Sequence, residues 1–467
     1  MNLKEVKHIY FLGAGGIGMS ALIRYFLVQG VKVAGYDKTA SDLTNELIAE
    51  GAQITFYDDV NHVHDFFKFA DHNQQALVVF TPAIPDDLAI KKWVLQSNII
   101  SLKRAEVLGF ICHEHPTLAV AGTHGKTTTS TLLAHILVEA GMQPWAFLGG
   151  ISANYNTNFL KGAESSWLVV EADEYDRSFL KLFPTISIIT STEADHLDIY
   201  GDGQQVINSF ADFAKQTQQL VVAQDNTNIN TKLDTPVEHY GLSNAFNTAQ
   251  KINVRDGAFH FDLTVNEHLI EDATLGMPGI HNIENAVAAS LVASKIGIGM
   301  PQIKQALANF KGVKRRFEVI VQHPEMVYID DYAHHPTELK ACIESVRMLY
   351  PNQRLTGIFQ PHLYSRTRDF YDGFAESLDL LDEIILLEIY PARELPIAGV
   401  SASELLNKCK NNHKILLPKN EITSYLKTHQ PQVLLTLGAG DIDLLVKPIK
   451  EVLENLIAQT NIQNQQP

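Results

Sequence analysis

One short stretch constrains this chain more than any other: residues 118–129, which read Leu-Ala-Val-Ala-Gly-Thr-His-Gly-Lys-Thr-Thr-Thr. Its apolar start predicts a buried strand, residues 122–125 predict a tight glycine loop, and the run from Lys126 predicts a helix. Such a unit forms a phosphate cradle, because loop N–H groups and the positive helix end face the anion. Lys126 would add a point charge and Thr127 a hydroxyl ligand for Mg²⁺. We therefore expect a nucleotide triphosphate at this loop.

The loop departs from the usual phosphate-loop pattern. That pattern places a glycine five residues before the glycine of the Gly-Lys pair, and here the position is Val120. What stands is the shorter run Gly122-x-x-Gly125-Lys126-Thr127. An ordinary strand-to-helix turn with a solvated lysine is the alternative. We favour the phosphate site because the strand and the helix fall where the chemistry needs them.

Length and charge limit the other possibilities. A chain of 467 residues is too long for one hydrophobic core and suits two to four domains. The net charge of −16 argues against nucleic acid or an anionic membrane as a partner, because both favour basic surfaces. Three scattered cysteines fit a reducing cytosol, and no signal peptide or membrane-length apolar run is visible. We expect a cytoplasmic protein that is a monomer or a homodimer.

Residues 1–110 predict a Rossmann-like domain. A strand over 8–12 is followed by a glycine-rich turn, a helix, and a second strand that ends at Asp37. Glycines in this turn allow close approach of a diphosphate, and Asp37 could hold ribose hydroxyls. The alternative is a glycine turn that serves only the packing of helix on strand. The residues predict a nucleotide diphosphate but do not decide which nucleotide binds.

Residues 111–313 predict a central domain around the phosphate loop. A strand that ends at Glu171 would place this carboxylate beside the triphosphate as a Mg²⁺ ligand, although a solvated acidic loop is also consistent with the run. After a further strand, His196 stands among acidic residues, where a ligand or proton-handling role is expected. Asn282 and Asn285 lie on one face of a later helix and could bind a base or cap the helix.

Residues 314–467 predict a third α/β domain. Strands expected over 326–329, 355–359, 383–387 and 433–437 alternate with helices, as in a doubly wound sheet. A basic run at 314–317 indicates a hinge. Histidine and arginine residues follow two of the strand ends, which is a plausible site for a small carboxylate.

Several motifs, taken in order, resemble those of the Mur ligases, the ATP-dependent enzymes that add amino acids to the peptidoglycan precursor. The motifs are most similar to those of the members that join L-alanine to UDP-N-acetylmuramate. They are Gly13-x-Gly-Gly-x-Gly-Met-Ser20, Gly122–Thr128, Glu171-Ala-Asp-Glu, Asp195-His196, Gly279–Asn285, Arg315-Arg-Phe-Glu318, Asp331–Glu338, Phe359-Gln-Pro-His362 and Gly438–Ile442. The resemblance implies an α/β fold of three domains: an N-terminal Rossmann-like domain, a central P-loop-type sheet with a small antiparallel sheet, and a C-terminal Rossmann-like domain.

The resemblance also implies roles for individual residues. The UDP-sugar would bind at Gly13, Gly15, Gly16, Gly18, Met19, Ser20, Asp37 and His124. ATP would bind at Gly122, Thr123, His124, Gly125, Lys126, Thr127, Thr128, Asn282, Asn285 and Arg316. Mg²⁺ would be held by Thr127, Glu171 and His196. The catalytic set would be Lys126, Glu171, His196, Arg316 and Asp331, and the amino acid would meet Tyr332, His334, His362 and Arg366.

The implied reaction begins with transfer of a phosphoryl group from ATP to the carboxylate of UDP-N-acetylmuramate. The acyl phosphate is then attacked by the amino group of L-alanine, whose proton passes to His196 or His334. Where related alanine-adding enzymes often carry arginine, this chain has Leu363, so binding of the amino-acid carboxylate would depend more on Arg366.

Three alternatives are kept. A recycling ligase would attach an intact tripeptide to the same UDP-sugar. A nicotinamide-dependent dehydrogenase would explain the first glycine turn but not the phosphate loop. A non-catalytic nucleotide-binding regulator would leave the acidic and histidine motifs without a role.

Overall fold

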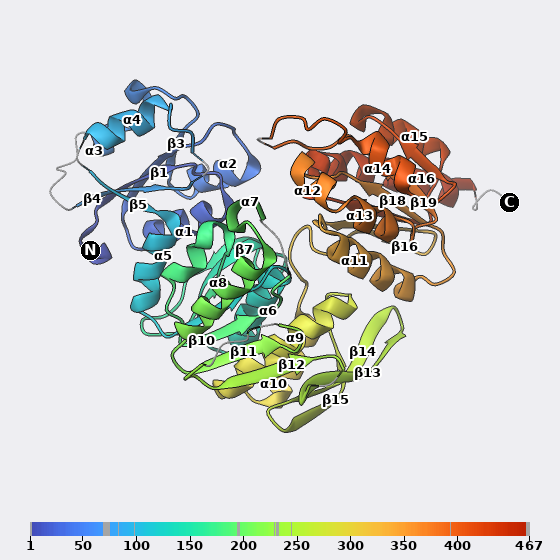
Figure 1. Cartoon of the computed structure of the whole chain (residues 1–467), viewed down its shortest axis with the longest axis horizontal. Helices are drawn as coiled ribbons and strands as arrows, with labels where there is room; N and C mark the ends of the chain where they lie inside the picture. The colour runs from blue at the N-terminus through green and yellow to red at the C-terminus, as the bar shows by residue number, and fades with distance from the viewer. Residues whose placement is uncertain are drawn as a thin grey trace. The chain divides into compact units, whose positions relative to one another are not determined.

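The computed structural model describes residues 2–68, 75–82, 84–97, 99–193, 197–227, 229, 233–243, 245–392 and 394–463. In these residues the chain is an α/β protein with three sheets, of five, ten and six strands (Figure 1). This confirms the expected fold class. The chain divides into two compact units: one of residues 1–250, 261–273 and 284–310, and one of residues 251–260, 274–283 and 311–467. The domain boundaries near 110 and 313 stay predictions.

The first sheet consists of five parallel strands in the order β3 (Gln53–Thr55), β2 (Lys32–Tyr36), β1 (His8–Leu12), β4 (Ala76–Phe80), β5 (Ile100–Lys103). Because the order reverses between β1 and β4, the loops after these two strands open into one crevice, where ligands bind in such sheets. The predicted glycine turn follows β1. The connecting elements are η1 (Leu3–Glu5), α1 (Ile17–Val28), α2 (Asp42–Ala49), η2 (Val60–His62), α3 (Asp65–Lys68), α4 (Ala89–Gln96) and α5 (Arg104–His113).

The ten-stranded sheet carries the phosphate loop near its middle. Its order is β15 (His268–Thr274), β14 (Ala258–Val265), β13 (Asn247–Arg255), β12 (Val237–Gly241), β11 (Leu220–Gln224), β10 (Ile186–Ile189), β6 (Thr117–Ala121), β9 (Leu168–Glu171), β7 (Trp145–Ser152), β8 (Thr157–Leu160). Strands β10, β6, β9 and β7 are parallel, so the loops after them meet at one edge. The helices are α6 (Lys126–Glu139), η3 (Tyr175–Lys181), α7 (Leu197–Tyr200), α8 (Gly203–Lys215), α9 (Ile280–Lys295) and α10 (Met300–Asn309).

Strands β13, β14 and β15 follow one another through two-residue turns. Asp256-Gly257 and Asn266-Glu267 join them, and all four residues have positive φ, as in type I′ turns. The three strands continue the edge of the ten-stranded sheet, in the domain where the resemblance implies a small antiparallel sheet.

The third sheet has the order β16 (Glu318–His323), β17 (Met326–Asp331), β21 (Val433–Leu437), β18 (Leu355–Phe359), β19 (Glu383–Leu386), β20 (Lys414–Leu416). Only β16 is antiparallel to its neighbour, and the remaining pairs are parallel. The other elements are α11 (Pro336–Leu349), α12 (Tyr364–Asp369), α13 (Tyr371–Leu378), α14 (Ala402–Lys408), η4 (Lys419–Glu421), α15 (Ile422–Thr428), η5 (Asp441–Leu445) and α16 (Val446–Gln463). Among the described residues, none of the helices combines the length and the apolar character needed to cross a bilayer.

In the first unit, helix α1 packs directly against the ten-stranded sheet. The Tyr25 ring lies 5.7 Å from the rings of both Trp145 and Phe147, centroid to centroid. The buried Arg24 guanidinium donates to the Asn158 side chain at 2.6 Å, and the Asn158 amide donates to the Ile17 carbonyl, also at 2.6 Å. These contacts fix the helix that starts at the glycine turn relative to the sheet that carries the phosphate loop.

Candidate active site

The phosphate loop has the backbone that the sequence predicts. Gly122 has φ +138° and Gly125, which caps α6, has φ +78°. A Cβ atom on Gly122 would lie 2.0 Å from the Thr190 hydroxyl, and one on Gly125 would lie 2.6 Å from the Asn285 side-chain oxygen. Both positions therefore require glycine for space as well as for conformation.

Lys126, the first residue of α6, is held by several acceptors. Its ammonium donates to the Gly122 carbonyl at 2.6 Å and to the Thr123 carbonyl at 3.2 Å. The Glu174 carboxylate accepts a further bond at 2.9 Å. Burial would lower the pKa of Lys126, but the charges of Glu174, Glu171 and Asp173 raise it above its usual value. Lys126 is thus a cation at the point where a phosphate would enter.

Glu171 and Thr127 provide oxygen donors near this lysine. Glu171 ends β9, and its carboxylate lies against Gly149 of β7: a Cβ there would be 2.1 Å from one carboxylate oxygen. Thr127 is the second residue of α6 and is buried. A hydroxyl and a carboxylate are the ligand types that Mg²⁺ prefers, with water and phosphate completing the shell. The residues fit the ion, and their role as its ligands stays a prediction.

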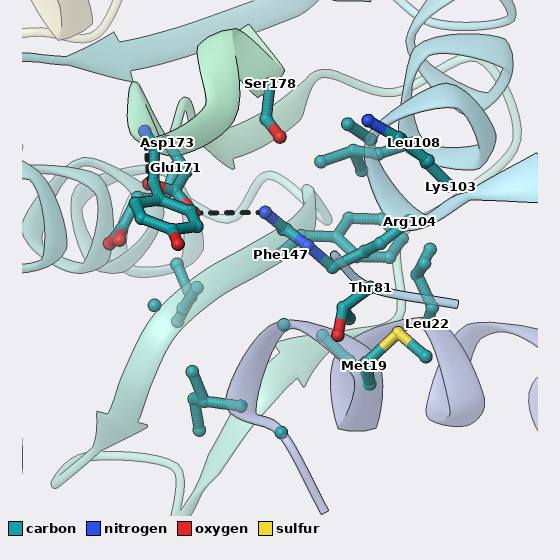
Figure 2. Close-up of a pocket in the computed structure, with 18 of the residues that line it drawn as sticks. Met19, Leu22, Thr81, Lys103, Arg104, Leu108, Phe147, Glu171, Asp173 and Ser178 are labelled. Carbon is teal, nitrogen blue, oxygen red and sulfur yellow. Dashed lines mark hydrogen bonds and ion pairs between the residues drawn. The ribbon is translucent and has the colours of Figure 1, made fainter. Parts of the chain in front are cut away.

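A cavity of about 260 Å³ joins the glycine turn of the first sheet to the acidic end of β9. The lining includes Gly16, Gly18 and Met19 from the turn, and Phe147, Gly149, Glu171, Asp173, Tyr175 and Ser178 from the second sheet and the residues after β9. In Figure 2, Met19 lies away from Glu171 and Asp173, with Arg104 between them. The N-termini of α1 and α5 both reach this cavity, so two positive helix ends face it. The arrangement suits an elongated anion with one end near the turn and the other near Glu171.

Arg104 is a cavity residue that the sequence analysis missed. It begins α5 and reaches across the cavity, where its guanidinium donates to Asp173 at 3.1 Å (Figure 2). A Cβ on Gly18 would lie 2.8 Å from a guanidinium nitrogen of Arg104, so this glycine makes room for the arginine. No local pattern marks this residue, because its partner is 69 positions away.

Two of the remaining residues predicted for the UDP-sugar, Asp37 and Ser20, form hydrogen bonds with the backbone of the turn and of α1. The Asp37 carboxylate accepts the Gly15 N–H at 2.7 Å and the Thr39 N–H at 3.1 Å, so it supports the turn itself. Ser20 is fully buried and donates to the Ile17 carbonyl at 2.8 Å. Gly13, Gly15, Ser20, Asp37 and His124 are not among the described residues that line the cavity. The sugar-nucleotide roles of all these residues stay predictions.

The residues predicted for the base and the loop lie as follows. The His124 ring nitrogen is 3.3 Å from Glu193, and Thr123 donates from its hydroxyl to Ser191 at 3.0 Å. Asn285 lies against Gly125. Asn282, the third residue of α9, donates from its side-chain amide to the Pro278 carbonyl at 2.6 Å. Thr128 is buried at the start of α6, and His196 lies outside the described residues.

The second unit brings Arg316, Tyr332 and Asp331 together. The Arg316 guanidinium carbon lies 4.8 Å from the centre of the Tyr332 ring. Asp331 accepts the N–H groups of Phe317 and Ala333, both at 2.7 Å, and burial raises its pKa to about 6. The predicted hinge is therefore hydrogen-bonded to the end of β17, and the Arg316 guanidinium lies over the Tyr332 ring.

The residues predicted for the amino acid gather at the ends of β17 and β18. The His334 and His362 rings are 6.3 Å apart, and His362 stacks on Tyr390 at 5.7 Å. Burial, with help from His334 and Arg366, lowers the pKa of His362 to about 4, so it is neutral at physiological pH. Arg366 is buried in α12. The residue before this helix, Leu363, has a φ of +70°. Such strain in a leucine is typical of functional sites.

Comparison with known proteins agrees with this geometry. The Mur ligase family catalytic domain matches residues 8–115, the Mur ligase middle domain matches 120–293, and the Mur ligase glutamate ligase domain matches 315–440. The UDP-N-acetylmuramate–L-alanine ligase of Flavobacterium psychrophilum is 46% identical to this chain over 460 residues, covering 97% of this chain and 100% of that protein. The chain therefore belongs to the Mur ligase family.

Solved structures show the same relationship. The UDP-N-acetylmuramate–alanine ligase MurC of Thermotoga maritima matches with a TM-score of 0.82 at 26% identity, covering 96% of this chain and 99% of that one. A murein peptide ligase of Psychrobacter arcticus matches with a TM-score of 0.69 at 23% identity, covering 96% and 99%, and shows the shared fold.

Proposed function

We propose that this protein joins L-alanine to the carboxylate of UDP-N-acetylmuramate, with ATP as co-substrate and an acyl phosphate as intermediate. One observation carries the proposal within the family: a single cavity connects the glycine turn of the first sheet with Glu171, which neighbours Lys126 of the phosphate loop. A sugar nucleotide bound there would extend its carboxylate towards the γ-phosphate of ATP. The dehydrogenase and regulator alternatives leave this connection without a purpose.

In the first step, a carboxylate oxygen attacks the γ-phosphorus and ADP leaves. Both reactants are anions, so the site must offset their repulsion. Lys126 supplies a fixed positive charge, and Arg316 would supply another from the second unit. Mg²⁺, held by Thr127, Glu171 and the predicted His196, would neutralise charge on the phosphate oxygens.

In the second step, the amino group of L-alanine attacks the acyl carbon, and inorganic phosphate leaves. The attacking amine must first lose a proton. His334 is a candidate acceptor in the described residues, with Tyr332 beside it and its own Nδ1 3.1 Å from Glu338. His196 is the other predicted acceptor. The carboxylate of L-alanine would bind Arg366, which is preorganised by burial in α12.

L-Alanine is favoured over an intact tripeptide because two relatives that are 46% identical, and matched over their whole length, carry the L-alanine ligase name. A cytoplasmic location is part of the proposal, supported by three cysteines that are all buried free thiols. A monomer or a homodimer stays the prediction for the oligomeric state.

Phosphate release tests the proposal. The purified protein would be mixed with ATP, Mg²⁺ and UDP-N-acetylmuramate, and then with L-alanine, glycine, L-serine or the murein tripeptide in separate reactions. We expect rapid release with L-alanine and formation of the amide product, seen by mass spectrometry. Faster turnover with the tripeptide would favour the recycling ligase, and no ATP consumption with any amine would refute the proposal.

A further inference from the structure

Glu174 is a buried carboxylate to which the proposed reaction gives no role. It stands beside the phosphate loop, and only 2% of its side chain is exposed. Burying a carboxylate to this degree costs several kcal/mol unless an opposite charge and hydrogen bonds compensate. The compensating charge here is the ammonium of Lys126, the residue expected to bind the triphosphate.

Both oxygens of Glu174 contact this ammonium. The Nζ atom of Lys126 lies 2.9 Å from Oε1 and 2.8 Å from Oε2. The backbone that carries the carboxylate is also fixed, because the Tyr200 hydroxyl donates to the Glu174 carbonyl at 2.6 Å. The neighbouring turn is closed by a bond from the Tyr175 N–H to the Asp173 carboxylate at 3.1 Å. Glu174 thus contacts Lys126 from a rigid support.

The other acceptors of Lys126 belong to the phosphate loop itself. They are the carbonyl oxygens of Gly122 and Thr123. An ammonium has three protons, so a phosphate can bind Lys126 only when one of the present acceptors gives way. A loop that takes up an anion turns its N–H groups towards it, which turns its carbonyls away. Once the two carbonyls release the ammonium, Glu174 remains as its acceptor in the chain.

We infer that Glu174 is a positioning residue for Lys126. It keeps the ammonium in place while the loop carbonyls release it, so that Nζ faces the phosphoryl group during transfer. The inference rests on the proposed role of Lys126 in binding ATP. It requires a negative charge at position 174, because an ionised acceptor makes the stronger hydrogen bond to an ammonium. Burial raises the pKa of the Glu174 carboxyl to about 7, so the tests are run at about pH 8.

Two variants of Glu174 and one control test this inference. E174Q keeps the size and an acceptor oxygen but removes the charge, while E174D keeps the charge and withdraws it by one methylene. The control is E164Q, because Glu164 is an exposed carboxylate in the same unit. Turnover would be measured by phosphate release, and ADP affinity would be measured by calorimetry without sugar nucleotide or amino acid.

We expect E174Q to lower kcat about 100-fold, the size of effect that a misplacement of about 1 Å produces. Its affinity for ADP should be unchanged or higher, because the variant removes a negative charge near the phosphates. E174D should recover at least about fivefold of the lost kcat, and E164Q should match the wild type. A purely structural role would instead weaken ADP binding and lower the melting temperature together with kcat.

Wild-type kcat in E174Q would overturn the inference, and so would a loss of ADP affinity that parallels the loss of kcat. If E174Q does not fold, E174D decides: a loss of kcat in that variant with an equal loss of ADP affinity overturns the inference. Failure of the proposed function is distinguishable, because then the wild-type protein itself shows no turnover while its ADP binding can still be measured.

Discussion

Replacing Gly149 by alanine should displace Glu171 and slow the reaction about 100-fold. The new Cβ would lie 2.1 Å from one Glu171 oxygen and 2.2 Å from the carboxyl carbon. Non-bonded atoms attract best at about 3.5 Å or more, so the carboxylate must retract by roughly 1 Å. A shift of about 1 Å in a catalytic group costs about 100-fold in rate, or about 2.7 kcal/mol.

The assay is phosphate release over a range of Mg²⁺ concentrations. We expect Gly149→Ala to need more Mg²⁺ for half-maximal rate, with partial recovery at saturating Mg²⁺, because Glu171 is the proposed ligand. Gly299→Ala is the matched control: Gly299 has φ −73°, and its added Cβ would come no closer than 3.4 Å to a neighbour. Thermal unfolding of both variants checks that the fold is kept.

An unchanged rate and an unchanged Mg²⁺ requirement in Gly149→Ala would refute the reasoning. So would an equal loss at every Mg²⁺ concentration, because that result would separate Glu171 from the metal. In either case the end of β9 would have a structural role only.

Three further predictions concern other parts of the site. Arg104→Met should raise the KM for UDP-N-acetylmuramate roughly 30-fold in steady-state kinetics, because a lost charged hydrogen bond costs about 2 kcal/mol of binding free energy. The KM for ATP should stay unchanged. Asn158→Ala should lower the free energy of unfolding by about 1–3 kcal/mol in urea titrations, because it removes the buried partner of Arg24; unchanged stability would contradict this. Burial lowers the pKa of His281 to about 4 in the folded protein, whereas the unfolded value is about 6.5. Between these pH values the unfolded chain binds a proton that the folded chain does not, so the free energy of unfolding decreases as pH falls from about 6.5 to 4. Relative to His281→Gln, the wild type should lose roughly 2 kcal/mol between pH 7 and pH 5, and parallel pH curves for the two proteins would disprove the assignment.

Local chemistry explains what could be predicted from the sequence. The strands over 8–12, 355–359 and 433–437 have the predicted bounds, because each is an apolar run that ends at turn residues. The phosphate loop was predictable because glycine, and few other residues, can adopt the required φ at 122 and 125. The acidic run after β9 was harder to interpret, since a solvated loop has the same composition.

Long-range pairing explains what could not be predicted. Lys126 and Glu174 are 48 positions apart, and Arg24 and Asn158 are 134 apart. No periodicity or local motif connects such residues. The pairing of β9 with β6 brings Glu174 to Lys126, and the packing of α1 on the ten-stranded sheet brings Arg24 to Asn158. The sequence predicted that Asp37 could hold ribose hydroxyls, and this role stays a prediction. Its bond to Gly15 became visible only when the first sheet was assembled.

The transfer of an oxygen atom tests the central claim most directly. UDP-N-acetylmuramate labelled with ¹⁸O in its carboxylate would be incubated with ATP, L-alanine and the wild-type protein, and the released phosphate would be analysed by mass spectrometry. If ATP activates the acid in the cavity between the glycine turn and Glu171, one ¹⁸O atom appears in each phosphate. Release of unlabelled phosphate alongside the amide product would contradict the account.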